Sequence, residues 1–365
     1  MIINCRLPKI LLLSFSLVQM IFLCACEKGL EENQTITETL LYVVAANGNL
    51  RKEGNQKVNV LVQSTPRNID LYVLKATSRK EGCLFVHRTQ LGLDTVWVED
   101  GTRFDQCLKS AVAYLSKRTL PNLSMIIFSH ADGWYPSEMS LKSAVIDNYT
   151  DLSLKDLYDV LSPLHFRTIA FESCNMGSIE VLSQFYSLCD YLIASSTELL
   201  SPGFKPLYEK GTVSLCDKAF VEEFVFSFAE EMDKQEDPLN SYAIAAYQTS
   251  KVSELVEAFK SVMESNDVKV DLESVQQLHR SNDDKVYYDF QSYINNTNLS
   301  GLKKLEISTL LSEIVVCKYN SKLFLLPYSG FRINEYCGIS VFDFANESKY
   351  HSQYTSWFND ITFRK

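Results

Sequence analysis

A cysteine and a histidine stand at equivalent places in this sequence, each directly after a strand-like apolar run. Cys174 follows the run in RTIAFESCNMGSIEVL, and a helical pattern begins soon after it, at Gly177. His130 follows an earlier run, in LSMIIFSHADGW, with small residues and a glycine next. A thiolate is a strong nucleophile, and an imidazole can take up and return its proton. The two residue types therefore suit acyl transfer by covalent catalysis.

Both residues are expected at one edge of a parallel sheet. The carboxyl ends of parallel strands meet at the same edge, where open α/β sheets build their sites. The start of the helix after Cys174 carries partial positive charge, which predicts a lowered thiol pKa. A lone cysteine at a strand end is more often structural, as is a lone histidine. Their joint occurrence at neighbouring strand ends favours a catalytic pair.

At these residues the sequence resembles the clostripain family of cysteine peptidases, which shares a clan with caspases, legumain and gingipains. Members show a strand ending in His-Gly-Gly-Gly-Trp, then a strand ending in Asp-Ala-Cys-Leu-Met-Gly. The corresponding strings here are HADGW at 130–134 and ESCNMG at 172–177. Segments 42–50, 189–204 and 337–344 also match the family, so the resemblance covers most of residues 39–365.

The resemblance implies a role for each residue at the site. Cys174 is the expected nucleophile, and His130 the general base that later protonates the leaving amine. The backbone N–H groups of Cys174 and Ala131 are the expected oxyanion hole. The family usually has glycine at position 131, so alanine fits there only with a negative φ.

Glu172 is the residue predicted to set specificity. Residues two apart on a strand share a face, so Glu172 and Cys174 are expected to project together toward the cleft. The family has an aspartate there that pairs with a basic side chain, which implies cleavage after Arg or Lys. A bidentate contact would favour Arg. The alternative is that Glu172 caps the following helix or pairs with a local lysine.

Three further residues are weaker candidates. Asn47 and Asn49 fall in a family stretch after the first strand and are expected to line the cleft, although an ordinary turn is an equal alternative. Lys142 lies between the His and Cys strands, where relatives often cleave themselves. It is the candidate for self-cleavage, with a solvated loop lysine as the alternative.

The N-terminus predicts a lipoprotein signal peptide over residues 1–25. Arg6 and Lys9 precede an apolar run at 10–22, and Leu-Cys-Ala-Cys at 23–26 is similar to a lipobox. Lipid on Cys26, followed by a polar tether over 26–38, predicts anchoring in a bacterial cell envelope, at the periplasmic face or on the cell surface, with release also open. An uncleaved signal anchor is the alternative, although a membrane span needs about 20 apolar residues.

Charge and cysteine content limit the classes of partner and cofactor that this protein is expected to bind. The formal net charge of −10 disfavours nucleic acid and anionic membrane surfaces. Seven cysteines follow Cys26, singly and in apolar runs, which favours buried thiols over a disulfide framework. No metal-ligand spacing or phosphate-binding loop is visible, so no cofactor is expected. Calcium is implied only by the resemblance, since some relatives depend on it.

Strand and helix patterns alternate through the first half of the chain. Strands are predicted at 40–46, 69–74, 83–87, 124–129, 168–172 and 191–195, with helices at 103–115, at 178–188 and between Ser153 and Pro163. This order indicates a three-layer α/β/α sandwich with a mostly parallel, caspase-like sheet over 39–210. Residues 211–365 are expected to be a C-terminal extension packed on it, with helices at 219–232, 242–248, 252–263 and 272–279 and strand-like segments near the end.

The leading hypothesis is an envelope-anchored cysteine endopeptidase that cleaves protein or peptide substrates after basic residues. A second is a weak or inactive pseudo-peptidase that binds peptides without turnover. A third is a lipoprotein hydrolase of esters or amides, which shares the dyad but not the acidic pocket.

Overall fold

A nine-stranded sheet forms the centre of the molecule. The computed structural model describes residues 35–46, 48–77, 82–89, 92–134, 143–147, 150–264, 268–280, 286–343 and 354. The strand order is β12-β10-β9-β8-β5-β1-β2-β3-β4. Five central strands are parallel, namely β1 (Glu38–Ala45), β2 (Ile69–Ala76), β5 (Leu123–Ser129), β8 (Phe166–Glu172) and β9 (Cys189–Ser195). Antiparallel pairing adds β3 (Gly82–Thr89) and β4 (Gly92–Asp100) on one side, and β10 (Ala243–Gln248) and β12 (Val315–Asn320) on the other.

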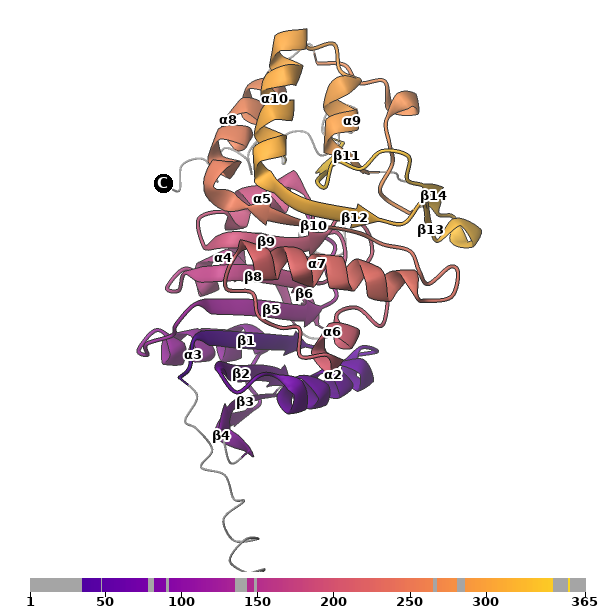
Figure 1. Cartoon of the computed structure of the whole chain (residues 1–365). Helices are drawn as coiled ribbons and strands as arrows, with labels where there is room; N and C mark the ends of the chain where they lie inside the picture. Colours follow the sequence, from indigo (N-terminus) through magenta and orange to yellow (C-terminus); the bar gives the residue numbers. More distant parts are fainter. Residues whose placement is uncertain are drawn as a thin grey trace, which may run out of the picture. The chain divides into compact units, whose positions relative to one another are not determined.

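Helices cover both faces of the sheet (Figure 1). Alternate side chains of β1 enter opposite cores, with Leu41 and Val43 on one side and Tyr42 and Val44 on the other. The first core is closed by α3 (Phe104–Leu115), α4 (Leu154–Leu161), α5 (Ile179–Phe185) and α8 (Val252–Met263). The second is closed by α2 (Arg51–Ser64), α6 (Lys205–Glu209) and α7 (Lys218–Asp233). The predicted three-layer sandwich with a mostly parallel sheet is confirmed.

Residues after 210 both extend the sheet and add a smaller layer. β10 and β12 are strands of the main sheet itself. The remaining elements are η1 (Thr249–Lys251), η2 (Leu272–Ser274), β11 (Tyr287–Asp289), α9 (Phe290–Asn295), α10 (Gly301–Ile314), β13 (Leu323–Phe324), η3 (Leu326–Tyr328), β14 (Phe331–Arg332) and β15 (Ser340–Phe342). β11 pairs with β15, β13 with β14, and β6 (Ser143–Asp147) with β7 (Thr150–Ser153).

Two helices predicted from the sequence are wrong. Residues 242–248 form β10, because a short apolar run is buried on both faces between β9 and β12, where helix propensity does not decide. Residues 272–279 make one 3-10 turn and then continue in an extended conformation, with Gln277 bridged to Tyr288. α2 and α10 were not predicted.

The cysteines are free thiols, as expected from the sequence, but only three of the seven are buried. All seven that follow Cys26 are free thiols. Cys83, Cys107 and Cys189 are fully buried in the first core. The fold is therefore held by packing of the two cores, without disulfide support among the described residues.

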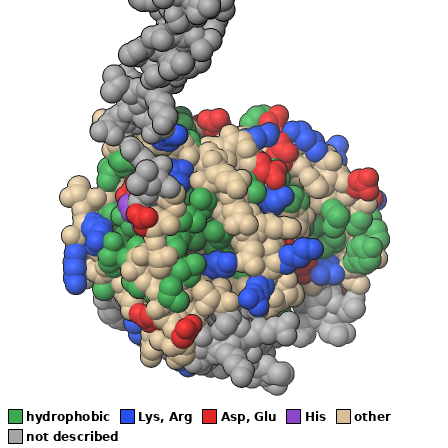
Figure 2. Space-filling model, turned by 90° about the horizontal axis from the view of Figure 1, so that it is seen from below, with side chains coloured by type: hydrophobic (Ala, Val, Ile, Leu, Met, Phe, Trp, Pro, Cys, Tyr) green, Lys and Arg blue, Asp and Glu red, His purple; other side chains and the backbone are tan. Residues whose placement is uncertain are grey.

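The surface seen from below carries interspersed basic and acidic side chains around apolar ones (Figure 2). No single charge sign dominates this face. Among the described residues, no helix has the length and apolar character needed to cross a bilayer.

Candidate active site

The histidine and cysteine strands are neighbours in the sheet. β5 pairs with β8 in parallel. Just past this pairing, the hydroxyl oxygens of Ser129 and Ser173 lie 3.1 Å apart. His130 follows Ser129 and Cys174 follows Ser173, and adjacent strands are about 4.8 Å apart. The two candidates therefore leave the sheet side by side at its carboxyl edge.

Asn49 positions the histidine. It lies in the turn before α2, and its Oδ1 is 2.7 Å from Nε2 of His130, whose ring is exposed. A carboxamide oxygen only accepts hydrogen bonds, so this contact suits the tautomer that carries its proton on Nε2 and leaves Nδ1 as the acceptor. Asn49 was expected to line the cleft, and the structure gives it this direct contact. Asn47 lies outside the described residues.

A glycine lets the two catalytic loops touch. Gly133, in the loop after His130, has φ +62°. A Cβ there would lie 2.4 Å from the carbonyl oxygen of Asn175, in the loop after Cys174, and 2.9 Å from the hydroxyl of Tyr287. Only a residue without a side chain permits this approach. Gly133 therefore allows the loop after His130 to lie against the loop after Cys174.

Ala131 does not have a positive φ, which is what its methyl group requires. It is buried, and it is not among the residues with positive φ. Its side chain belongs to the first core, so the methyl replaces no space that the cleft needs. Its backbone conformation is accessible to any L-residue.

Hydrogen bonds from β9 and the segment after it hold the cysteine loop. The backbone N–H of Leu199 donates to Sγ of Cys174 at 3.4 Å. The N–H of Gly177 donates to the carbonyl of Ser195 at 2.7 Å. The thiol is therefore fixed in place and partly buried before any substrate arrives.

The surroundings of the thiol favour its neutral form. Burial, with smaller contributions from the carboxylates of Glu198 and Asp132, raises the pKa of Cys174 to about 11. The N–H of Leu199 and the guanidinium of Arg280 act in the opposite direction but are outweighed. The predicted lowering of this pKa by a helix start is wrong, because α5 begins beyond the thiol and loss of hydration dominates.

Glu172 does not reach the cleft. Its side chain is fully buried, with Oε1 2.6 Å from Nζ of Lys57 and 2.6 Å from the N–H of Phe204. Oε2 accepts a hydrogen bond from the hydroxyl of Tyr208 at 2.7 Å. The expectation that Glu172 and Cys174 project together is wrong, because Glu172 ends β8 and points into the helix layer below the sheet edge. The alternative expectation was that Glu172 pairs with a local lysine. It does pair with a lysine, but this is Lys57 from α2, far away in the sequence.

A second acid and an arginine lie near the thiol and were not singled out from the sequence. Glu198 follows β9, and its two carboxylate oxygens lie 3.0 and 2.9 Å from Nη2 of Arg280. The side chains are 27% and 34% exposed respectively. Nothing in the local sequence signals this contact, because the partners are far apart in the chain and only the fold joins them.

Several expected residues are outside the described part of the chain. They are Lys142, Asn47 and the signal region with Cys26. Within the described part, no group of three or more His, Cys, Asp or Glu side chains is placed to hold a metal ion.

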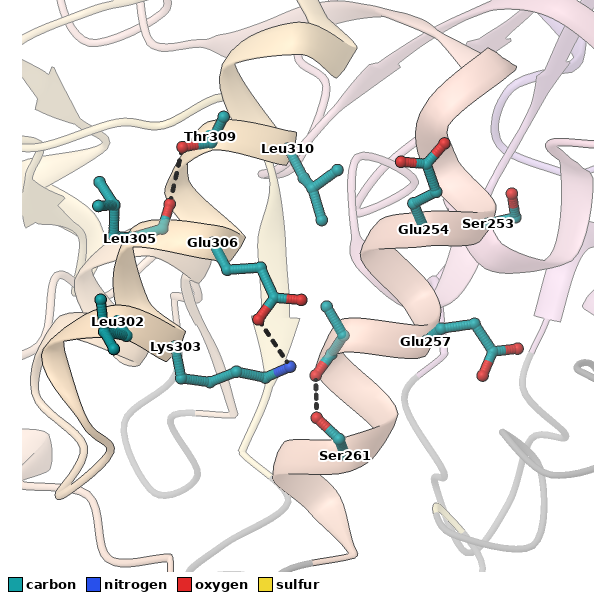
Figure 3. A pocket seen from close by; sticks show the side chains of 11 residues that line it. Ser253, Glu254, Glu257, Ser261, Leu302, Lys303, Leu305, Glu306, Thr309 and Leu310 are labelled. Atoms are coloured by element: carbon teal, nitrogen blue, oxygen red, sulfur yellow. Dashed lines mark hydrogen bonds and ion pairs between the residues drawn. The ribbon is translucent and has the colours of Figure 1, made fainter.

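A hollow between α8 and α10 is no alternative active site (Figure 3). The hydroxyls of Ser261 and Thr309 donate to carbonyls of their own helices, at 2.7 and 2.9 Å. Lys303 pairs with Glu306 at 3.1 Å. The lining contains no cysteine or histidine, so it offers no nucleophile with a base.

Solved structures share this fold. One is an inactive zymogen C11 protease from Parabacteroides distasonis, 19% identical, with a TM-score of 0.73, covering 90% of this chain and 98% of that one. Another is a secreted C11 cysteine protease from Bacteroides thetaiotaomicron, 18% identical, with a TM-score of 0.74 and coverage of 89% and 99%. A secreted C11 cysteine protease from the same species, in complex with an irreversible peptide inhibitor, is 18% identical, with a TM-score of 0.72 and the same coverage.

A comparison with curated proteins finds no match. The model of the clostripain family matches residues 98–336, which is well over half of the chain and includes both His130 and Cys174. The chain therefore belongs to the clostripain family of cysteine peptidases.

Proposed function

We propose that this protein is a cysteine endopeptidase that uses His130 and Cys174 as its catalytic dyad. The observation that carries the proposal is the register of β5 and β8, which sets the two residues side by side at the sheet edge. The contact of Asn49 with Nε2 supports it, because it leaves Nδ1 of His130 as the basic nitrogen.

The reaction would proceed by acyl transfer to the thiol. Nδ1 of His130 takes the proton of Cys174 as Sγ attacks the carbonyl carbon of the substrate. The protonated ring then gives that proton to the leaving amine. In the second half of the reaction the ring takes a proton from water as the water attacks the thioester, and it returns this proton to the leaving thiolate. Backbone N–H groups of Cys174 and Ala131 are the donors proposed for the oxyanion, an interaction worth about 3 kcal/mol per donor in comparable sites.

Substitution of the dyad tests the proposal against a binding protein without turnover. Cys174→Ala and His130→Ala should each abolish hydrolysis of a fluorogenic peptide library, and Cys174→Ala should also abolish labelling by a peptidyl electrophile. His165→Ala is the matched control, because His165 is exposed and pairs with Asp190 away from the dyad. Hydrolysis by Cys174→Ala protein at more than a few per cent of wild type would refute the assignment. Absence of both hydrolysis and labelling in wild type would favour the pseudo-peptidase.

The proposal does not extend to specificity for Arg or Lys. That specificity depended on Glu172, whose carboxylate contacts Lys57 inside the molecule. Self-cleavage after Lys142 depended on the same specificity and stays a prediction.

We also propose that lipid on Cys26 tethers the enzyme to the bacterial envelope. The support is the sequence alone, namely the order of cations, apolar run and Leu-Cys-Ala-Cys. Cys26→Ala should abolish incorporation of an alkyne fatty acid and move the protein out of the membrane fraction. Cys24→Ala is the matched control and should leave both unchanged. Fatty-acid labelling that persists in Cys26→Ala would contradict the site.

A further inference from the structure

The ammonium group of Lys57 already makes the contact that a basic substrate side chain would make with Glu172. Lys57 comes from α2, is 1% exposed, and places Nζ 2.6 Å from Oε1 of Glu172. Its remaining contacts are Glu53 at 2.8 Å and the ring face of Phe128, 3.9 Å from the centroid. An ammonium has three protons, and these three neighbours account for them.

The carboxylate of Glu172 also has all its hydrogen-bond positions occupied. Oε1 accepts hydrogen bonds from Nζ of Lys57 and the N–H of Phe204. Oε2 accepts from the hydroxyls of Tyr208 and Tyr42, at 2.7 and 3.4 Å. A carboxylate offers about four acceptor positions, and all are used. Burial and the charge of Glu172 raise the pKa of both tyrosines well above the ordinary value, so both stay protonated donors.

The backbone at Gly203 packs directly against the ion pair of Lys57 and Glu172. Gly203 has φ +58°, and a Cβ there would lie 2.6 Å from Oε1 of Glu172 and 2.9 Å from Nζ of Lys57. There is no room for a methyl group beside the pair, and still less for a guanidinium. A substrate could reach Glu172 only by expelling Lys57 and moving the chain at Gly203.

Of the three described charged side chains that act on the thiol, Glu198 and Arg280 neutralise each other, and Asp132 is a further acid. Glu198 and Arg280 are both partly exposed and are held in a contact of both carboxylate oxygens with one guanidinium. A cationic substrate side chain would have to break this pair to gain a new one, which gives little net attraction. An uncharged side chain disturbs neither ion pair.

We propose that Lys57 occupies Glu172 permanently, so that this peptidase accepts an uncharged side chain before the scissile bond and does not select Arg or Lys. The inference rests on the proposed peptidase function and deepens it. It also removes the reason to expect self-cleavage after Lys142.

Matched substrates test the proposal by hydrolysis. Peptides differing only in the residue before the leaving group would compare Arg with citrulline and Lys with norleucine, which are near-isosteric neutral partners. In wild type, kcat/KM within each pair should agree to about threefold. Lys57→Ala removes the ammonium and empties the space that the Lys57 side chain fills beside Glu172, so it should raise the Arg to citrulline ratio by about tenfold or more. Lys57→Ala/Glu172→Gln opens the same space without the acid and should return the ratio to that of wild type.

A binding measurement keeps the test independent of turnover. In the Cys174→Ala background, millimolar agmatine, a free guanidinium probe, should show no saturable binding by NMR titration. Adding Lys57→Ala, which empties the space beside Glu172, should create binding, and adding Lys57→Ala/Glu172→Gln should remove it. If wild type hydrolyses no peptide, the proposed function fails, yet the agmatine result still decides the role of Lys57.

Three results would overturn the proposal. One is a wild-type preference for Arg over citrulline of about a hundredfold or more, whether Glu172→Gln or Glu198→Gln removes it. The second is saturable agmatine binding to Cys174→Ala protein that Glu172→Gln abolishes. The third is an unchanged Arg to citrulline ratio in Lys57→Ala protein whose unfolding remains cooperative.

Discussion

Asn49 contacts the ring of His130, the proposed base. Its Oδ1 lies 2.7 Å from Nε2, which favours the tautomer with the proton on Nε2 and orients the ring. The sequence placed Asn49 near the cleft but could not show this contact, because the turn before α2 and the end of β5 meet only in the folded chain.

Substitution of Asn49 should separate catalysis from binding. Asn49→Ala should lower kcat by about 10- to 100-fold with KM nearly unchanged, because the ring loses its orientation while the substrate site is intact. Asn49→Asp should restore part of kcat and move the acid limb of the pH–rate profile to higher pH, because a carboxylate favours the protonated ring. Steady-state kinetics from pH 5 to 9 measure both. Equal changes in KM for the two variants would show that Asn49 contacts substrate instead.

The raised pKa of Cys174 predicts slow alkylation of the free enzyme. Only the thiolate reacts with iodoacetamide, so the rate at Cys174 should stay low at neutral pH and rise toward a midpoint near 11, where burial places the pKa. Mass spectrometry of the Cys174 peptide gives the rate at each pH. Urea-unfolded protein is the control, with a midpoint near about 8.5. A folded-state midpoint below that of the unfolded control would mean that His130 already holds the thiolate.

Elements rich in β-branched or aromatic residues were the most predictable. β1, β2, β3, β5, β8 and β9 were all expected, as were α3, α4, α7 and α8. β10 was mistaken for a helix because its alanines fit both states and only its neighbours β9 and β12 select the strand. α2 escaped prediction because Arg51–Ser64 is mostly polar and contains Gly54, which packs against β1 and Phe128.

At the site, too, features set by local sequence were predictable, and contacts between distant segments were not. The strand ends at His130 and Cys174 follow from local pattern, but the surroundings of Glu172 do not. How deep Glu172 sits, and that Lys57 meets it, depend on where α2 packs. Contacts between segments far apart in the chain leave no local signal, which is also why the pair of Glu198 and Arg280 was missed.

Gly133→Ala should damage activity more than stability. The added methyl group meets Asn175 O at 2.4 Å and must push apart the loops that carry His130 and Cys174. A displacement near 1 Å can cost about 100-fold in rate, so kcat/KM should fall by at least tenfold. Gly101→Ala is the control, because Gly101 has a similar φ of +75° with nothing within 4 Å of its Cβ position. Both variants should lose about 1–2 kcal/mol from the strained φ, measured by urea unfolding. Unchanged activity of Gly133→Ala would refute the close approach.

Across the whole molecule, the C-terminal segment supports the cysteine loop. The N–H of Ser340 donates to the carbonyl of Gly177 at 2.9 Å. Glu180, in α5, accepts from the N–H of Phe342 at 3.0 Å and from the hydroxyl of Tyr354 at 2.5 Å. The residues just after the nucleophile are therefore fixed by the last part of the chain.

Glu180 should make stability depend on pH. Burial raises its pKa, so the folded state favours the neutral acid. Its stabilising contribution is complete below the unfolded pKa, near about 4.5, and is lost as pH rises through the folded pKa. Glu180→Gln has no such loss, so its stability relative to wild type should increase with pH. Urea unfolding at pH 4.5, 6 and 8 measures this. Exposed Glu223→Gln is the control and should show little trend. A relative stability of Glu180→Gln that falls with pH would contradict the assignment.

The contacts from Ser340 and Phe342 bear on the timing of protein synthesis. A ribosome makes the chain from its N-terminus, so Cys174 leaves the exit tunnel long before the donors that hold Gly177 and Glu180 exist. A nascent chain that stops short of residue 340 carries the nucleophile on a loop without its backbone partner. The loop that carries Cys174 therefore gains these two contacts only after residues 340–342 have been added to the chain.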